Sequence, residues 1–135
     1  MTRDGKEIKG LNMYAGNAYN TYTENNINIE SPAKLIEMLY EGVLKFNAQA
    51  KKAIKDNDIE KKVYWLNRSI AVVNELRSIL DFKGGRVAEY LDGLYDYQLK
   101  LLFDAMVENE SKNLDECTNV FKGLLEAWRE TTNVA

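Results

Sequence analysis

Apolar residues recur at intervals of three, four and seven along most of the chain, which is the spacing of amphipathic α-helices. The pattern predicts four helices, at about 32–55, 59–81, 86–109 and 113–131. Ser31-Pro32 gives the first helix a capping hydroxyl followed by a proline at the first helical position. Asp58 is placed to cap the second helix, and Gly84-Gly85 is placed to end it. Strand signals are nearly absent, so the expected fold is all-α.

One face of each predicted helix is apolar and is expected to form the core. The expected core positions are Leu35, Leu39, Phe46, Ala50 and Ala53; Ile59, Val63, Leu66, Ile70, Val73, Leu76 and Leu80; Val87, Leu91, Leu94, Leu101, Leu102 and Ala105; and Leu114, Cys117, Phe121, Leu124 and Trp128. Because the connections are short, consecutive helices must lie side by side in opposite directions. The prediction is an antiparallel, up-down four-helix bundle over residues 31–135.

Residues 1–30 differ in composition from the rest of the chain, being polar and rich in Asn. We interpret this segment as a flexible N-terminal arm outside the core. It carries Tyr14, Tyr19 and Tyr22, and tyrosines are large amphipathic anchors. One hypothesis is that the arm covers an apolar surface of the bundle and is displaced when a partner binds there. The other is a disordered tail whose tyrosines have no role, and the pattern leaves both open.

The second and third predicted helices carry more apolar surface than a bundle core needs. At 100° per residue, the apolar arc spans roughly 200° on the second helix and roughly 240° on the third, against roughly 140° on the fourth. The residues that widen these arcs are Trp65, Val72 and Ile79 on the second helix and Tyr90, Tyr97, Leu99 and Phe103 on the third. Either the third helix is the most buried and its tyrosines extend to solvent, or these residues line a groove for an amphipathic helix of another protein.

Composition narrows the classes of function. The 135 residues are 45% apolar and 29% charged, the balance of one folded domain. The net charge of −3 lacks the basic excess that duplex binding requires, so we expect no nucleic-acid partner. The start of the chain lacks the pattern of a signal peptide, and no run approaches the roughly 18 apolar residues of a membrane span. We therefore expect a cytoplasmic protein without membrane insertion, and the single Cys117 excludes an intrachain disulfide.

Candidate chemistry is sparse because the chain contains no His, which excludes imidazole-based catalysis and imidazole metal sites. Glu37 and Glu41 lie one helical turn apart, but a bundle di-metal site also needs Glu-x-x-His ligands. The acidic residues from Asp56 to Glu60 resemble the start of a calcium loop, but Lys61 replaces the required glycine. We predict no catalytic residue, cofactor or metal. A carboxylate-bound metal enzyme is kept as the alternative from another class, to be tested by metal analysis.

The segment SPAKLIEMLYEG at residues 31–42 resembles the signature of the flagellin export chaperone family, FliS. Three further landmarks follow in the order of the family: Leu80-Asp81 before Gly84-Gly85, the segment LDGLYDY at 91–97, and Ala127-Trp128. The resemblance covers about residues 13–130. The chain departs from the family in residues 1–12, which precede the usual start, and in the short link that leads to Gly84.

This resemblance implies a small cytosolic helical bundle without catalytic activity. It would bind the disordered C-terminal segment of flagellin, prevent premature polymerisation and support export. The family's N-terminal segment is thought to pack over part of the apolar surface until flagellin arrives, so Tyr14 and Tyr19 match a regulatory arm. With the residues that widen the arcs, the predicted partner-binding set is Tyr14, Tyr19, Trp65, Val72, Ile79, Tyr90, Tyr97, Leu99 and Phe103. The alternative is an adaptor or regulator that binds another flagellar protein, such as an anti-sigma factor or a co-chaperone.

Overall fold

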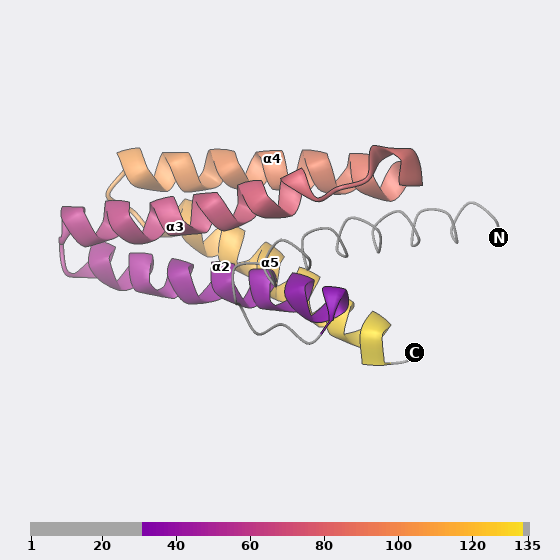
Figure 1. Cartoon of the computed structure of the whole chain (residues 1–135). Helices are drawn as coiled ribbons and strands as arrows, with labels where there is room; N and C mark the ends of the chain where they lie inside the picture. Colours follow the sequence, from indigo (N-terminus) through magenta and orange to yellow (C-terminus); the bar gives the residue numbers. More distant parts are fainter. Residues whose placement is uncertain (1–30, 134–135) are drawn as a thin grey trace, which may run out of the picture.

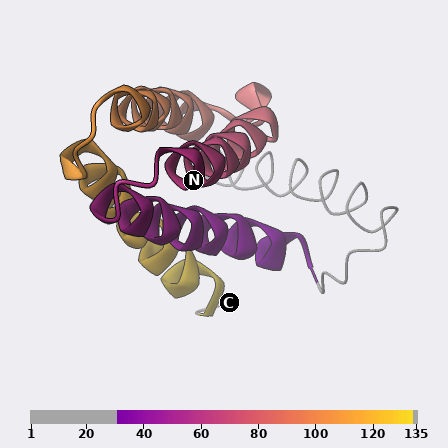
Figure 2. The same cartoon turned by 90° about the vertical axis from the view of Figure 1, so that its left-hand side faces the viewer.

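The computed structural model describes residues 31–133, which contain four α-helices and one short 3₁₀ helix. The helices are α2 (Pro32–Lys55), α3 (Ile59–Ser78), α4 (Arg86–Val107) and α5 (Lys112–Asn133), with η1 (Phe82–Gly84) between α3 and α4. Helix α2 contacts α3 and α5, and α4 contacts the same two helices. Figures 1 and 2 both show α3 lying between α2 and α4. The predicted antiparallel four-helix bundle is confirmed, while the predicted arm at residues 1–30 lies outside the described residues.

Local hydrogen bonds fix the starts of α2 and α3, as the sequence predicted. The Ser31 hydroxyl accepts a hydrogen bond from the backbone N–H of Lys34 at 3.1 Å, with Pro32 at the first helical position. The Asp58 carboxylate accepts from the backbone N–H of Lys61, also at 3.1 Å. Between the two helices, Asn57 adopts a φ of 54°, a left-handed conformation that Asn tolerates better than most residues. The tight turn therefore brings α3 back along α2.

The junction between α3 and α4 differs from the prediction. Helix α3 ends at Ser78 instead of continuing to residue 81. The Asp81 side chain accepts from the backbone N–H of Lys83 at 3.0 Å and so caps the short helix η1. Gly85 then reverses the chain with a φ of 112°, a conformation that favours glycine. A second cap three residues after α3 thus competes with continuation of the helix.

The core contains most of the expected apolar positions, with three informative differences. Ile59 is 66% exposed, because it is the first residue of α3 and lies at the end of the bundle. Phe46 is only partly buried and stacks on Trp65 at the edge between α2 and α3. Leu99, which the sequence placed at the margin of its helix, is only 8% exposed and belongs to the core. Helix α4 is therefore rotated so that Tyr95, Leu99 and Leu102 face inward.

Two buried side-chain amides differ in their hydrogen bonding. The Asn47 amide donates to the hydroxyl of Thr118 at 3.2 Å and to the sulfur of Cys117 at 3.6 Å, and its oxygen accepts from Ser69 at 2.6 Å. It thereby connects α2, α3 and α5. Gln98 on α4 is fully buried, and its amide nitrogen and oxygen have no partner within residues 31–133.

Cys117 is a free, fully buried cysteine, and desolvation raises the pKa of its thiol to about 12. The thiol is therefore protonated at neutral pH, which makes it a poor nucleophile. Among the helices within residues 31–133, none has the length and apolar character needed to cross a membrane.

Candidate protein-binding site

An apolar pocket with a volume of about 520 Å³ opens at one end of the bundle. At this end α2 and α4 begin and α3 and α5 finish, on the right-hand side of Figure 1. All four α-helices of the described region contribute to its lining, together with the link after α3; the lining residues are Ala33, Ile36, Tyr40, Leu76, Ile79, Leu80, Val87, Leu91, Tyr95, Leu124, Ala127, Trp128, Thr131 and Thr132. The pocket is therefore the open end of the bundle core, and an apolar side chain from outside fits its chemistry.

Two tyrosines form the inner end of this pocket. Tyr40 and Tyr95 are the lining residues of α2 and α4 that lie farthest along the chain from the open end. Their hydroxyl oxygens are 2.9 Å apart, and the ring of Phe121 packs against both, with centroid distances of 6.0 and 6.3 Å. Desolvation by burial raises the pKa of both hydroxyls, so the pair is neutral at physiological pH. This hydrogen bond joins two diagonally opposed helices.

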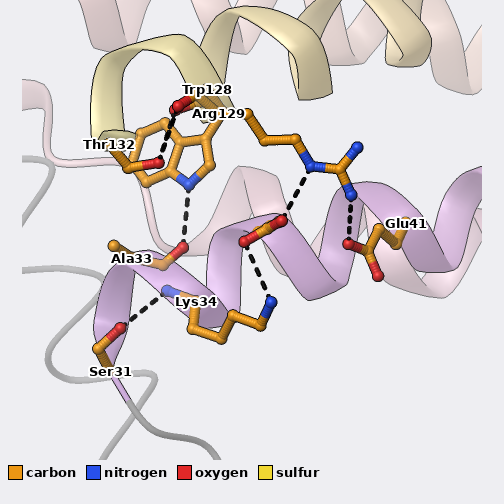
Figure 3. Close-up of polar contacts among 8 residues, drawn as sticks. Ser31, Ala33, Lys34, Glu41, Trp128, Arg129 and Thr132 are labelled. Carbon is orange, nitrogen blue, oxygen red and sulfur yellow. Dashed lines mark hydrogen bonds and ion pairs between the residues drawn. The ribbon is translucent and has the colours of Figure 1, made fainter. Parts of the chain in front are cut away.

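One wall of the pocket is fastened by contacts between the end of α5 and the start of α2, shown in Figure 3. The indole N–H of Trp128 donates to the carbonyl oxygen of Ala33 at 2.9 Å. Arg129 donates from Nε to Glu37 at 2.9 Å and from Nη2 to Glu41 at 2.7 Å. The hydrogen bond from Arg129 is the main reason that the pKa of Glu37 is lowered. The carboxylates considered above as metal ligands thus bind an arginine instead.

The other wall carries a matching arrangement between α3 and α4. Arg77, in the last turn of α3, donates from Nε to Asp92 at 2.6 Å and from Nη1 to Asp96 at 3.2 Å. As with Arg129, one guanidinium near the end of a helix spans two carboxylates four residues apart near the start of its neighbour. The two arginines therefore hold the helices in pairs, α2 with α5 and α3 with α4, on either side of the pocket. No group of three or more potential metal ligands occurs in the part of the chain that the structure describes.

The sequence-predicted residues of α3 lie along its edge with α2. Trp65, Val72 and Ile79 are spaced by seven residues and are all partly buried. Ile79 lines the pocket, and Trp65 stacks on Phe46 of α2 with a centroid distance of 5.7 Å. Between them, Gly42 leaves room beside Val72, since a Cβ at Gly42 would lie 4.0 Å from its Cγ2. We call this stripe of Gly42, Phe46, Trp65, Val72 and Ile79 the α2–α3 seam.

The predicted residues of α4 divide into separate surfaces. Tyr90 and Tyr97 are 68% and 48% exposed and lie two turns apart on the same face, where the Tyr97 hydroxyl donates to Glu116 at 3.3 Å. Phe103 is 53% exposed, but its position six residues after Tyr97 places it on another side of the helix. Leu99 is in the core, as described above. The structure therefore groups Trp65, Val72 and Ile79, and it does not bring Phe103 to them; Tyr14 and Tyr19 lie outside the described residues.

Sequence reasoning missed the pocket itself. Val87, Leu91, Leu124 and Trp128 were expected to be core positions, and they instead line the opening. Their apolar spacing is the same in either case, because a core face and a pocket lining have the same periodicity. Whether such a face is a core face or a pocket lining depends on how far the helix ends lie apart, and the apolar spacing within one helix carries no signal for that distance.

The fold and the pocket define a four-helix-bundle protein with an open apolar end. Residues 15–135 match the model of the family described as flagellar protein FliS. The chain is 55% identical over 117 residues to the flagellar secretion chaperone FliS of Campylobacter jejuni subsp. jejuni, covering 86% of this chain and 91% of that protein. It is also 30% identical to the flagellar secretion chaperones FliS of Bacillus subtilis, with 84% and 85% of the two chains covered, and of Salmonella typhimurium, with 87% and 92% covered. The chain belongs to the FliS family.

Proposed function

We propose that this protein is a cytosolic flagellar secretion chaperone that binds the disordered C-terminal segment of flagellin, prevents its premature polymerisation and supports its export. The names of its relatives in three bacteria support the general role. The apolar pocket of about 520 Å³ at the open end of the bundle is the observation that carries the proposal. A segment that forms amphipathic helices can place apolar side chains there instead of assembling with its own copies.

The binding surface that we propose extends from the pocket along the α2–α3 seam. Trp65, Val72 and Ile79 provide a partly buried apolar stripe to which a helix can add contact area. Tyr90, Tyr97 and Phe103 provide exposed aromatic surface on α4. Ordering a disordered client costs free energy at binding, so a large contact area is compatible with the moderate affinity that a carrier needs for release. Neither the binding of the client nor its release requires catalysis by this protein.

We also propose that residues 1–30 act as a lid, with Tyr14 and Tyr19 as anchors. The support is positional, because this segment joins the bundle at Ser31, directly before the pocket-lining residues Ala33 and Ile36. A segment whose C-terminal end is attached beside the pocket is well placed to cover it. Such a lid would compete with the client and would reduce its apparent affinity.

Calorimetric titration with the C-terminal segment of flagellin from the same organism tests both proposals. We expect saturable one-to-one binding with a negative heat-capacity change, the signature of apolar burial. A variant without residues 1–23 should bind more tightly if the lid competes. Absence of binding by both proteins, with helicity intact, would contradict the flagellin assignment and favour an adaptor for another flagellar protein. Equal affinities of the two proteins would contradict the lid alone.

A further inference from the structure

Arg68 lies on the exposed side of α3 over a cluster of three aromatic rings. Its Cζ is 4.8 Å from the ring centroid of Phe46, 5.6 Å from that of Tyr64 and 6.0 Å from that of Trp65. The rings of Phe46 and Trp65 stack, and Tyr64 meets Trp65 edge-on at 4.9 Å. We call these three side chains the aromatic platform. Cation–π contacts of this kind hold a guanidinium in a defined orientation.

The polar contacts of Arg68 differ from those of the two wall arginines. Arg77 and Arg129 each bind two carboxylates. Arg68 donates from Nη1 to the hydroxyl of Tyr64 at 3.3 Å, and no carboxylate of residues 31–133 lies within ion-pair distance of it. A guanidinium has five N–H donors in a planar fork that matches a carboxylate. Arg68 therefore presents an oriented positive charge with donors still available.

The charges along this side of α3 are not uniform. Lys61 lies two turns before Arg68, and its pair with Asp58 is long, at 3.9 Å. Glu75 lies two turns after Arg68, toward the pocket. A partner carboxylate is thus attracted at the Arg68 end of the seam and repelled nearer the pocket. Ile79, which lines the pocket, follows Arg68 by eleven residues, or about three helical turns.

We propose that Arg68 and the aromatic platform bind an Asp or Glu side chain of the client segment. The carboxylate pairs with the guanidinium, and a neighbouring apolar side chain of the client packs against the exposed ring of Tyr64. This inference rests on the proposed function and adds a charge pattern to it. The client carries its acidic residue about three helical turns from the apolar side chain that enters the pocket.

Calorimetric titration of the full chain with a synthetic peptide of the flagellin C-terminal segment tests the proposal. We expect Arg68→Gln to weaken binding about tenfold, because a charge-assisted bidentate contact is lost. Arg68→Lys should recover only part of that loss, since an ammonium lacks the planar fork. The matched control is Lys122→Gln, which removes one exposed positive charge from α5, the helix diagonal to α3. It should leave the affinity within about twofold.

Peptides in which each Asp or Glu is replaced singly by Asn or Gln identify the partner group. One such peptide should bind the wild-type protein about tenfold more weakly and should show no further loss with Arg68→Gln. Wild-type affinity of Arg68→Gln, with normal helicity, would overturn the inference and leave the proposed function standing. If Arg68→Gln weakens binding but none of the peptides with a single Asp or Glu replacement binds more weakly, the assignment of a carboxylate as the partner group would be overturned. Failure of the wild-type protein to bind would instead contradict the proposed function.

Discussion

The hydroxyl oxygens of Tyr40 and Tyr95 lie 2.9 Å apart at the inner end of the pocket and join α2 to α4 across the bundle. Two hydroxyls carry two protons, and this contact uses one of them. The contact is the polar boundary between the apolar core and the pocket, which both tyrosines line.

Removing either hydroxyl of this pair alone should lower the free energy of unfolding by more than half of the loss caused by removing both. Tyr40→Phe or Tyr95→Phe leaves the other hydroxyl buried without its partner, so we expect the free energy of unfolding to fall by about 1–2 kcal/mol. The double variant removes both polar groups and should lose less than the sum of the single losses. Urea denaturation of the four proteins measures this, and strictly additive losses would show that the two hydroxyls do not interact.

The two buried amides should respond in opposite ways to apolar replacement. The Asn47 amide is hydrogen-bonded to Ser69 on α3 and to Cys117 and Thr118 on α5, so Asn47→Leu should lower the free energy of unfolding by about 2–3 kcal/mol. Gln98 has no partner in the described region, so Gln98→Met should raise it by about 1 kcal/mol. Urea denaturation midpoints with unchanged slopes provide the measurement. Destabilisation by Gln98→Met would contradict the expectation that the amide is buried without a hydrogen-bond partner.

The contact between Arg129 and Glu37 should make the α2–α5 wall sensitive to acid. The pKa of Glu37 is lowered from 4.5 in the folded protein, so its contribution is present above pH 4.5 and is lost as the pH falls through the folded value. Because Arg129 is half exposed, we expect only about 0.5–1 kcal/mol. Denaturation at pH 6 and pH 3 should show a smaller acid loss for Glu37→Gln than for wild type, whereas Glu130→Gln should match wild type.

Two charged substitutions on α4 should distinguish a core position, Leu99, from an exposed position, Phe103. Leu99→Glu places a carboxylate in the core and should lower the free energy of unfolding by at least about 3 kcal/mol. Phe103→Glu lies at an exposed position, so its helicity and stability should stay close to wild type while client binding weakens. Circular dichroism and calorimetric titration distinguish the two effects. Normal stability of Leu99→Glu would contradict the orientation of α4, and normal binding by Phe103→Glu would remove that residue from the proposed surface.

Local signals were sufficient for most of the secondary structure. The bounds predicted for the first helix, 32–55, agree with α2, because Ser31 and Pro32 start it through contacts within one turn. The end of α3 was predicted three residues too late, because Asp81 caps a separate short helix. The apolar pattern is compatible both with continuation of the helix and with a new cap at Asp81, so it does not distinguish them.

The candidate site depended more on tertiary structure. An apolar arc wider than a core needs leaves the rotation of a helix undetermined, and for this reason Leu99 was assigned to the surface when it faces the core. The seven-residue spacing of Trp65, Val72 and Ile79 did identify one edge of α3. That this edge adjoins Phe46 and Gly42 depends on how α2 packs against it.

The sequence by itself determined the fold class, the helix starts and the family, because these depend on periodicity, capping and residue order along the chain. The tertiary structure decided the pocket, the pairing of Arg77 and Arg129 with their carboxylates, and the placement of Arg68 over the aromatic platform. Each of these joins side chains from different helices. Their distances are set by how far the helices separate and how each one is rotated, and neither quantity is encoded in the spacing within a single helix.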